Sequence, residues 1–388
     1  MAEPVWSRPV DNCARVHHGP RTRYRLRIKL PQSVILKRFR RRVLQRQKQH
    51  RHRGGKRLWP AAKGRRRPEF AVIMLPTEIS LRQSAYRRLT IRACRVVRET
   101  FISDGRDVLL DFSRTKAIKS EGMLLLYAEV DRAIRMGRTE QIMRCKLPTG
   151  QSDEAQIVRQ VLEQIGLLHR LGATTKPPAA GDNDYHESVR HWRYATGTRV
   201  DEKPGDVLEK HEGRVAPGLM QGMQVGLTEA LINSLHHAYK TARNDGCSPF
   251  NERRWWMFTH ERAGMLNVLV CDLGIGIPRS LPLTWDRDLL KKLTSLFSGA
   301  PKHVAAIKMA LVLGESSTGD EHRGKGLPQI WNATAASSAG GVGILGGKAY
   351  VGLQSETGAI YENQFSTDIM GTVIFWTVPV ESTDGPLG

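Results

Sequence analysis

The sequence has few cysteines and no long apolar run. Its five cysteines are scattered over 388 residues and are never spaced C-x-x-C. This excludes a disulfide framework and the usual zinc-finger spacings, and it fits a reducing compartment. No stretch approaches the ~20 apolar residues of a membrane span. The N-terminus also lacks the apolar segment of a secretory signal, so the sequence predicts a cytoplasmic protein without a membrane span.

Acidic residues are almost absent from the first 67 positions. This segment holds 22 Lys and Arg, 17 of them Arg, against only Glu3 and Asp11. The other 321 residues hold 38 basic and 36 acidic side chains, so +20 of the net charge of +22 lies in residues 1–67. Like charges this dense cannot pack into a core. We therefore predict a disordered basic arm at 1–67, followed by a nearly neutral globular body.

The composition of the arm leaves its partner open. Nucleic acid is one interpretation, because each phosphate that Lys or Arg neutralises releases counterions. An acidic membrane surface suits it less, since the arm has little apolar material to insert. A transit peptide would contain more serine than Ser7 and Ser33. An extension without a dedicated partner fits the composition as well as nucleic acid does.

Residues 68–172 alternate between short apolar runs and apolar residues at helical spacing. This pattern predicts strands at 70–75, 108–112 and 141–147, and helices at 81–102, 122–134 and 157–171. Strands that alternate with helices indicate an α/β layer with helices packed against a sheet. A turn-rich linker at 173–184 then separates this domain from a second one at 185–381.

Three segments of the first domain resemble the STAS domain, the fold of anti-sigma factor antagonists. They are Val-Leu-Leu-Asp-Phe-Ser (108–113), Ile-Lys-Ser-Glu-Gly-Met (118–123) and Val-Leu-Glu-Gln-Ile-Gly-Leu (161–167). The resemblance implies that Ser120 is at the phosphoacceptor position, where the N-terminus of a helix would favour a phosphate. Lys119 stands where the family has Asp, which inverts the charge of the loop. The alternative is that Ser120 is an N-cap and that Gly122 permits the turn.

A polar stripe marks the helix predicted at 223–240 in the second domain. Leucines at i, i+4 spacing are expected to pack on the core, and a neighbouring stripe holds Glu229, Asn233 and His237. Asn near the buried side of a helix is costly without a partner. Mg²⁺, which takes oxygen ligands and keeps waters, would supply one. A carboxylate one turn earlier is placed to orient or deprotonate a nucleophile, whereas a partly exposed helix face is the alternative.

Two glycine-containing motifs follow. An apolar strand leads to Asp272, and Gly274 and Gly276 then allow positive φ and close approach of the backbone to a ligand. An Asp at a strand end can accept a hydrogen bond from an exocyclic amine. His-Arg-Gly-Lys-Gly-Leu (322–327) opens a helix, where backbone amides and basic side chains favour phosphate oxygens. A hairpin turn and a solvated loop are the respective alternatives.

The three motifs resemble the N, G1 and G2 elements of the GHKL ATPases, in the same order. Thr372, which opens a final strand at 373–378, corresponds to the GT element of this superfamily. Within this superfamily, the sequence of the first motif is most similar to the anti-sigma factor serine kinases. The resemblance covers 185–381 and implies a Bergerat-type α/β sandwich. It implies that Asn233 binds Mg²⁺, that Asp272 binds the adenine amine with support from Thr372, and that Glu229 is the base. The other implied nucleotide contacts are His237, Gly274, Gly276, Arg323, Gly324, Lys325 and Gly326. Residues 279–324 would form a mobile ATP lid, which is long for a serine kinase of this type.

The sequence as a whole thus predicts an α/β chain with a STAS-like domain followed by an ATP-binding domain. The favoured function is an ATP- and Mg²⁺-dependent serine/threonine kinase or slow ATPase, which acts in a switch with a regulatory protein partner. One alternative is a non-catalytic, nucleotide-gated module that the arm delivers to nucleic acid. A mechanical, dimerising GHKL ATPase would need a transducer domain after the ATP site, and few residues follow the last predicted strand. Whether the chain forms a homodimer stays open.

Overall fold

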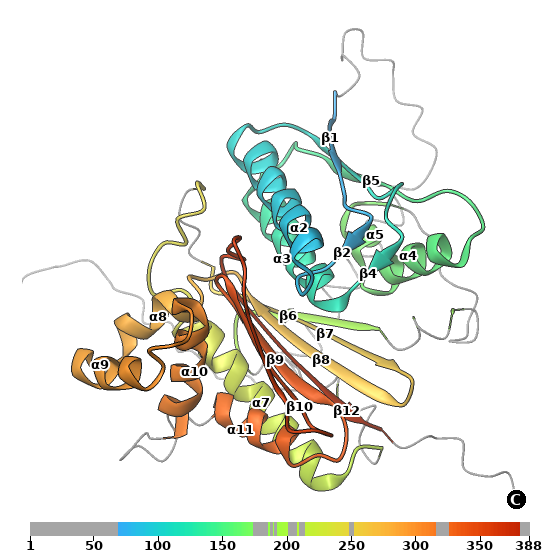
Figure 1. Cartoon of the computed structure of the whole chain (residues 1–388). Helices are drawn as coiled ribbons and strands as arrows, with labels where there is room; N and C mark the ends of the chain where they lie inside the picture. Colours follow the sequence, from blue (N-terminus) through green and yellow to red (C-terminus); the bar gives the residue numbers. More distant parts are fainter. Residues whose placement is uncertain are drawn as a thin grey trace, which may run out of the picture. The chain divides into compact units, whose positions relative to one another are not determined.

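The computed structural model describes residues 69–173, 185–186, 189, 192–200, 208, 214–247, 252–315 and 326–380. The predicted arm and nearly all of the predicted linker lie outside these ranges. The described residues belong to one compact unit. Within it, a parallel sheet with helices comes first and a seven-stranded antiparallel sheet with helices follows (Figure 1). The predicted α/β class is therefore confirmed.

The N-terminal part, residues 69–173, contains a parallel sheet in the order β1-β3-β5 and a short parallel pair, β2-β4. Its strands are β1 (Ala71–Met74), β2 (Glu78–Ile79), β3 (Val108–Asp111), β4 (Ala117–Ile118) and β5 (Met143–Lys146). Its helices are α2 (Ser84–Val97), which continues into the π-helical turn η1 (Arg98–Ser103), α3 (Ser120–Met136), α4 (Asp153–Gln164) and α5 (Leu167–Arg170). The three expected strands and the helices expected at 81–102 and 122–134 are confirmed. The single helix expected at 157–171 is divided into α4 and α5 at Gly166, and the pair β2-β4 was not predicted.

The start of α3 differs from what the sequence suggested. Lys119 is the N-cap and Ser120 is the first helical residue, so the expectation that Ser120 caps the helix is wrong. A Cβ added at Gly122 would lie 2.7 Å from the backbone nitrogen of Ser80. Glycine is therefore needed at this position because α3 packs directly on the backbone next to β2, and not because the chain turns there.

The C-terminal part, residues 185–380, is built on an antiparallel sheet in the order β11-β10-β9-β12-β8-β7-β6. The strands are β6 (Arg193–Gly197), β7 (Trp255–Arg262), β8 (Met265–Asp272), β9 (Gly341–Gly346), β10 (Ala349–Gln354), β11 (Ile360–Gln364) and β12 (Thr372–Pro379). Its helices are α7 (Pro217–His236), α8 (Ile277–Thr284), α9 (Arg287–Leu296), α10 (Lys302–Glu315) and α11 (Gly326–Ala335). The strand ending at Asp272 and the final strand appear where the sequence predicts them. The helix that contains Asn233 was predicted at 223–240 but spans Pro217–His236, so that His237 is its C-cap.

Both faces of this sheet are covered. Side chains alternate along β7, so that Trp255 and Met257 face one side while Trp256 and Phe258 face the other. The first side packs with buried residues of α7, α10 and α11. The second side packs with α3, which contacts β7, β8 and β12. A continuous cluster of buried side chains therefore joins the N-terminal part to the second face of the sheet.

Candidate functional site

Five of the residues singled out in the sequence line one cavity of about 120 Å³. They are Asn233, His237, Asp272, Gly276 and Thr372. The helical spacing of four places the first two on one face of α7. Strand pairing places the others, because Asp272 at the end of β8 lies opposite Thr372 at the start of β12. Residues from motifs about 140 positions apart therefore meet at one end of the sheet.

Asp272 is the central polar group of this cavity. The side chain is 5% exposed, and its carboxylate accepts hydrogen bonds from the Gly274 amide, at 2.9 Å, and from Thr372. Burial raises its pKa to about 6, although these hydrogen bonds and the positive charge of Arg243 act in the opposite direction. The carboxyl group is therefore ionised at neutral pH and can accept a further hydrogen bond from a ligand.

The two glycines after Asp272 are required by close packing. A Cβ at Gly274 would lie 2.1 Å from the carbonyl oxygen of Ala238. Gly276 has φ +74° and borders the cavity just before α8 begins. The positive φ expected from the sequence is thus present at Gly276. At Gly274 the close neighbour is the backbone that follows α7, so the loop and α7 are held together at this point.

His237 and Asn233 bring further polar groups to the cavity. The Nδ1 atom of His237 is buried and has no hydrogen-bond partner within the described ranges. Burial, with the charges of Lys240 and His236, lowers the pKa of His237, so its ring is neutral at pH 7. The half-buried Asn233 supplies an amide oxygen. A polar ligand would satisfy both groups.

The other predicted site residues are placed as follows. Glu229 is half-buried on α7, one turn before Asn233, and it is not among the residues that line the cavity. Burial raises the pKa of its carboxyl group. Arg323, Gly324 and Lys325 lie outside the described residues, while Gly326 begins α11 and the next residue borders the cavity. Ser120 begins α3 in the N-terminal part.

The apolar wall of the cavity was not predicted from the sequence. It is formed mainly by the segment after Gly276, together with single residues of α10, α11 and β12. Its apolar members are Ile277, Leu281, Trp285, Ala310, Leu327 and Ile374, with Ala230 and Ala238 in and just after α7. The spacing of 277, 281 and 285 could have revealed the first three, because it places them on one helical face. The cavity is smaller than the ~300–1,000 Å³ of typical ligand pockets. A whole nucleotide would therefore extend beyond this volume.

The side chains of the cavity limit how the predicted Mg²⁺ would be held. No group of three or more His, Cys, Asp or Glu side chains placed to hold a metal occurs in the part of the chain that the structure describes. Asn233 would accordingly be its single protein ligand, and phosphate oxygens and water would have to complete the octahedron.

Comparison of the chain with protein-family models and with curated proteins gave no match. The resemblance to GHKL ATPases therefore depends on the residues described above. None of the helices in the described ranges is long and apolar enough to span a bilayer.

The raised pKa of Asp272 predicts an effect of pH on stability. An unperturbed aspartate titrates near pH 3.9. Between this value and about 6, the folded chain retains a proton that the unfolded chain has released, so burial of Asp272 costs stability as the pH rises. We expect the Asp272→Asn variant to gain stability over the wild type as the pH rises from 4 to 6.5, by at most ~3 kcal/mol. Urea unfolding at a series of pH values measures this, and a difference independent of pH would contradict it.

Proposed function

We propose that the C-terminal part binds ATP with Mg²⁺ and that the chain is a regulatory protein of the GHKL type. The observation that supports this most strongly is the buried Asp272 at the end of β8, with Thr372 opposite it and Asn233 in the same cavity. An antiparallel sheet with α7, α10 and α11 on one face is compatible with a Bergerat-type sandwich. The parallel sheet and helices of residues 69–173 are likewise compatible with a STAS-like domain.

The chemistry of the cavity suits a base that carries an exocyclic amine. Its wall is largely apolar, and the carboxylate of Asp272 can only accept hydrogen bonds when ionised. An exocyclic amine donates to such a group, and an unpaired buried charge makes a base without such a donor costly to bind. That this base is adenine follows from the resemblance to the GHKL ATPases. Asn233 would hold Mg²⁺, which would supply positive charge to the phosphates.

In this proposal the phosphoryl group passes to a serine or threonine of a protein or to water. Glu229 takes the proton from the attacking hydroxyl group, one helical turn from Asn233. The output is a switch with a regulatory protein partner. The alternative is a nucleotide-gated binding module without turnover, in which Glu229 has no chemical role. Measured turnover separates the two. A cytoplasmic location stays a prediction.

Substitution of Asp272 tests the nucleotide site directly. We expect Asp272→Asn to weaken ATP binding tenfold or more, since a hydrogen bond to a charged group contributes ~1.5–3 kcal/mol. Asn233→Ala should lose the part of the affinity that depends on Mg²⁺. Thr228→Ala, on the exposed face of α7, is the matched control and should bind as the wild type does. Calorimetry with and without Mg²⁺ measures all three. Urea unfolding of each variant separates weak binding from misfolding, and unchanged affinity in both site variants would refute the ATP site.

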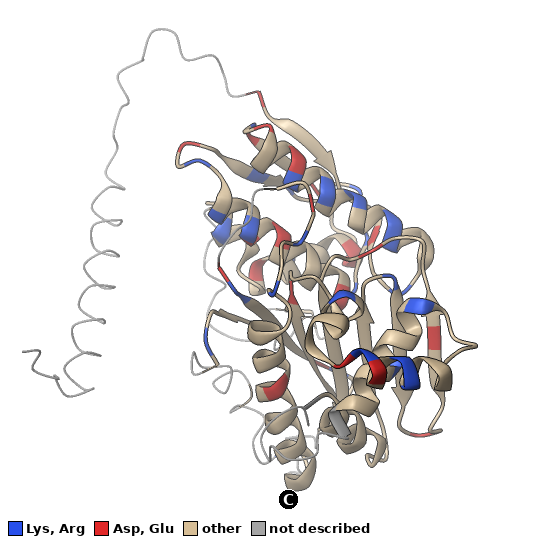
Figure 2. Cartoon of the chain, turned by 90° about the vertical axis from the view of Figure 1, so that its left-hand side faces the viewer, with Lys and Arg blue, Asp and Glu red and all other residues tan. Residues whose placement is uncertain are grey.

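A separate prediction concerns the basic segment 1–67. Figure 2 shows basic and acidic positions interspersed over the described helices and strands, so the strong positive charge of the chain comes from this segment. We expect removal of residues 1–67 to abolish binding of labelled DNA and RNA and to leave ATP affinity unchanged. Binding by the full chain should weaken steeply with salt, because it depends on counterion release. Equal retention of nucleic acid by both proteins would show that the segment has no such role.

A further inference from the structure

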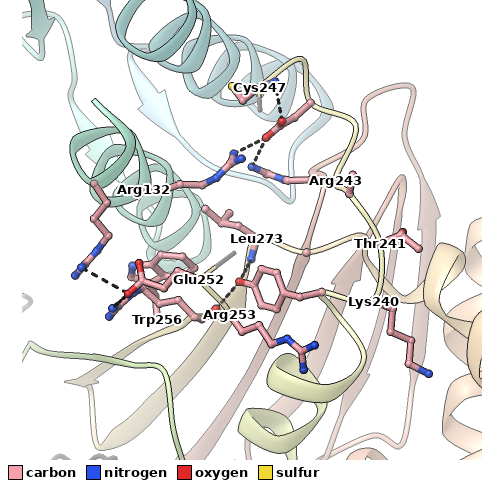
Figure 3. A pocket seen from close by; sticks show the side chains of 15 residues that line it. Arg132, Lys240, Thr241, Arg243, Cys247, Glu252, Arg253, Trp256 and Leu273 are labelled. Atoms are coloured by element: carbon pink, nitrogen blue, oxygen red, sulfur yellow. Dashed lines mark hydrogen bonds and ion pairs between the residues drawn. The ribbon is translucent and has the colours of Figure 1, made fainter. Parts of the chain in front are cut away.

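A second and larger cavity, of about 430 Å³, adjoins the residues that directly follow Asp272 (Figure 3). Leu273 and Gly274 form part of its wall, as do residues 239–243, which follow α7. The rest is formed by two arginines of α3, by Asp245 and Cys247, and by the segment that leads into β7. We call it the arginine cavity. The two cavities therefore share two backbone segments, 237–240 and 272–274. The first residues of each segment border the cavity around Asp272, and the following residues border the arginine cavity.

The arginine cavity is strongly positive. Six cations line it, against the carboxylates of Asp245 and Glu252. The cations are Arg132, Arg135, Lys240, Arg243, Arg253 and Arg254. Two further carboxylates, Glu129 and Asp131, pair with lining arginines but do not border the cavity. Even when these are included, an excess of at least two positive charges remains.

Two of the six cations account for this excess. Arg132, Arg135, Arg243 and Arg254 each form an ion pair with a carboxylate. Within the described ranges, Arg253 and Lys240 have only neutral partners. Arg253 donates to the Leu235 carbonyl at 3.2 Å, and Lys240 donates to the Leu283 carbonyl and the Thr284 hydroxyl.

Arg253 and Lys240 are both exposed and border the same partly enclosed space without a counter-charge. In such a space positive potential is concentrated and attracts an anion. Because both side chains are exposed, an anion can reach them without a rearrangement of the fold.

We propose that the arginine cavity binds a small molecule through a dianionic phosphate group. The charge of a phosphate monoester, close to −2 at neutral pH, balances Arg253 and Lys240. The planar guanidinium of Arg253 can hold two phosphate oxygens at once, while Lys240 acts as a point charge. The Tyr239 ring and the Leu273 side chain border the remaining volume, which accommodates the organic part of the molecule.

The proposal does not depend on ATP binding at Asp272, and the experiment keeps the two apart. The full chain carrying Asp272→Asn is titrated calorimetrically with inorganic phosphate, O-phosphoserine and AMP at constant ionic strength. We expect saturable binding, weakened at least tenfold by Arg253→Gln and by Lys240→Gln, since each removes a charge-assisted contact. Arg92→Gln, on the exposed face of α2, is the matched control and should not change the affinity.

The three probes distinguish the sources of the phosphate group. Tighter binding of AMP identifies a nucleotide, tighter binding of O-phosphoserine a phosphorylated amino acid, and equal binding of all three inorganic phosphate itself. Arg253→Lys retains the charge but not the two-pronged geometry, so it should bind with intermediate affinity and serves if Arg253→Gln does not fold. The absence of saturable binding by any probe, or equal affinity in the parent and both charge-removing variants, would overturn the proposal.

Discussion

Replacing Glu129 by alanine should lower the free energy of unfolding by about 3–5 kcal/mol, the usual effect of leaving buried charges without their partner. The Glu129 side chain is fully buried on α3 and accepts hydrogen bonds from Arg98, at 2.6 Å, and from Arg243. Arg243 follows α7 and also pairs with Asp245, which in turn pairs with Arg132 of α3. Without Glu129, three buried arginines would share the single carboxylate of Asp245.

The pKa of Glu129 also indicates that this carboxylate and the buried arginines stabilise one another. Burial alone would raise this pKa, but the charges of Arg243 and Arg98 outweigh burial and hold it below its usual value. A carboxyl group whose pKa is lowered by folding contributes stability above its unfolded pKa, near 4.3, and this contribution is lost as the pH falls through the folded value. The advantage of the wild type over Glu129→Gln should therefore shrink in acid.

Glu99 provides the matched control for this measurement. It pairs with Arg95 at 2.6 Å, but the two side chains are 48% and 69% exposed. Solvent screens such a pair, so Glu99→Ala should cost less than about 1 kcal/mol. Urea unfolding of both alanine variants gives the comparison, and Glu129→Gln replaces Glu129→Ala if that variant does not fold. Equal losses at the two positions would mean that the buried network does not join α3 to the segment after α7.

The buried ion pairs of α3 could not be predicted from the sequence. Along α3, the acidic and basic residues at 129, 131 and 132 have the composition of a solvated helix face, yet all three are buried. Their partners include Arg243, Asp245 and Trp256, which are more than a hundred positions away. Periodicity within α3 carries no information about these partners. The contact between the N-terminal part and the sheet was therefore not predictable from local pattern.

Only some strands of the seven-stranded sheet could be predicted from the sequence, because others depend on pairing with distant strands. The strands that end at Asp272 or begin at Thr372 have continuous apolar runs, which identify them locally. Strand β9 contains three glycines in six residues and was not predicted, because glycine is depleted in strands. It forms because β10 and β12 pair with it on either side. At Gly343 a Cβ would lie 2.3 Å from the ring of Phe375, so glycine makes room for a large neighbour on β12.

The candidate site was predictable where it depends on short motifs. Spacing on α7 led to Asn233 and His237 and the strand end led to Asp272, whereas Thr372 was expected from the resemblance to the GHKL ATPases. The wall formed by α8 and α10 was predicted only as a lid. Its helices close the cavity through side chains whose contacts are long-range, such as Trp285 and Ala310. Sequence patterns identified polar groups that can bind a ligand, whereas the volume of the cavity required the structure.

Replacing Glu229 by alanine should reduce turnover of ATP by ~10²–10⁴-fold, the usual contribution of a positioned general base. ATP affinity should remain nearly unchanged, because Glu229 does not line the cavity around Asp272. Burial raises the pKa of Glu229, which is the direction that suits a group that must accept a proton. If Asn233 holds Mg²⁺ as proposed, Glu229 would lie one helical turn from the phosphates, while Asp272 would hold the base.

The experiment compares release of inorganic phosphate with transfer of label from γ-labelled ATP to protein. The wild type and Thr228→Ala, which changes the neighbouring exposed residue of α7, should turn over ATP equally. If Ser120 receives the phosphate, mass spectrometry will find it there and Ser120→Ala will remove the label from protein. Phosphate released only to water would make the chain an ATPase and exclude self-phosphorylation. If the wild type and Glu229→Ala bind ATP but share the same negligible turnover, Glu229 is not a base and the nucleotide acts only as a ligand.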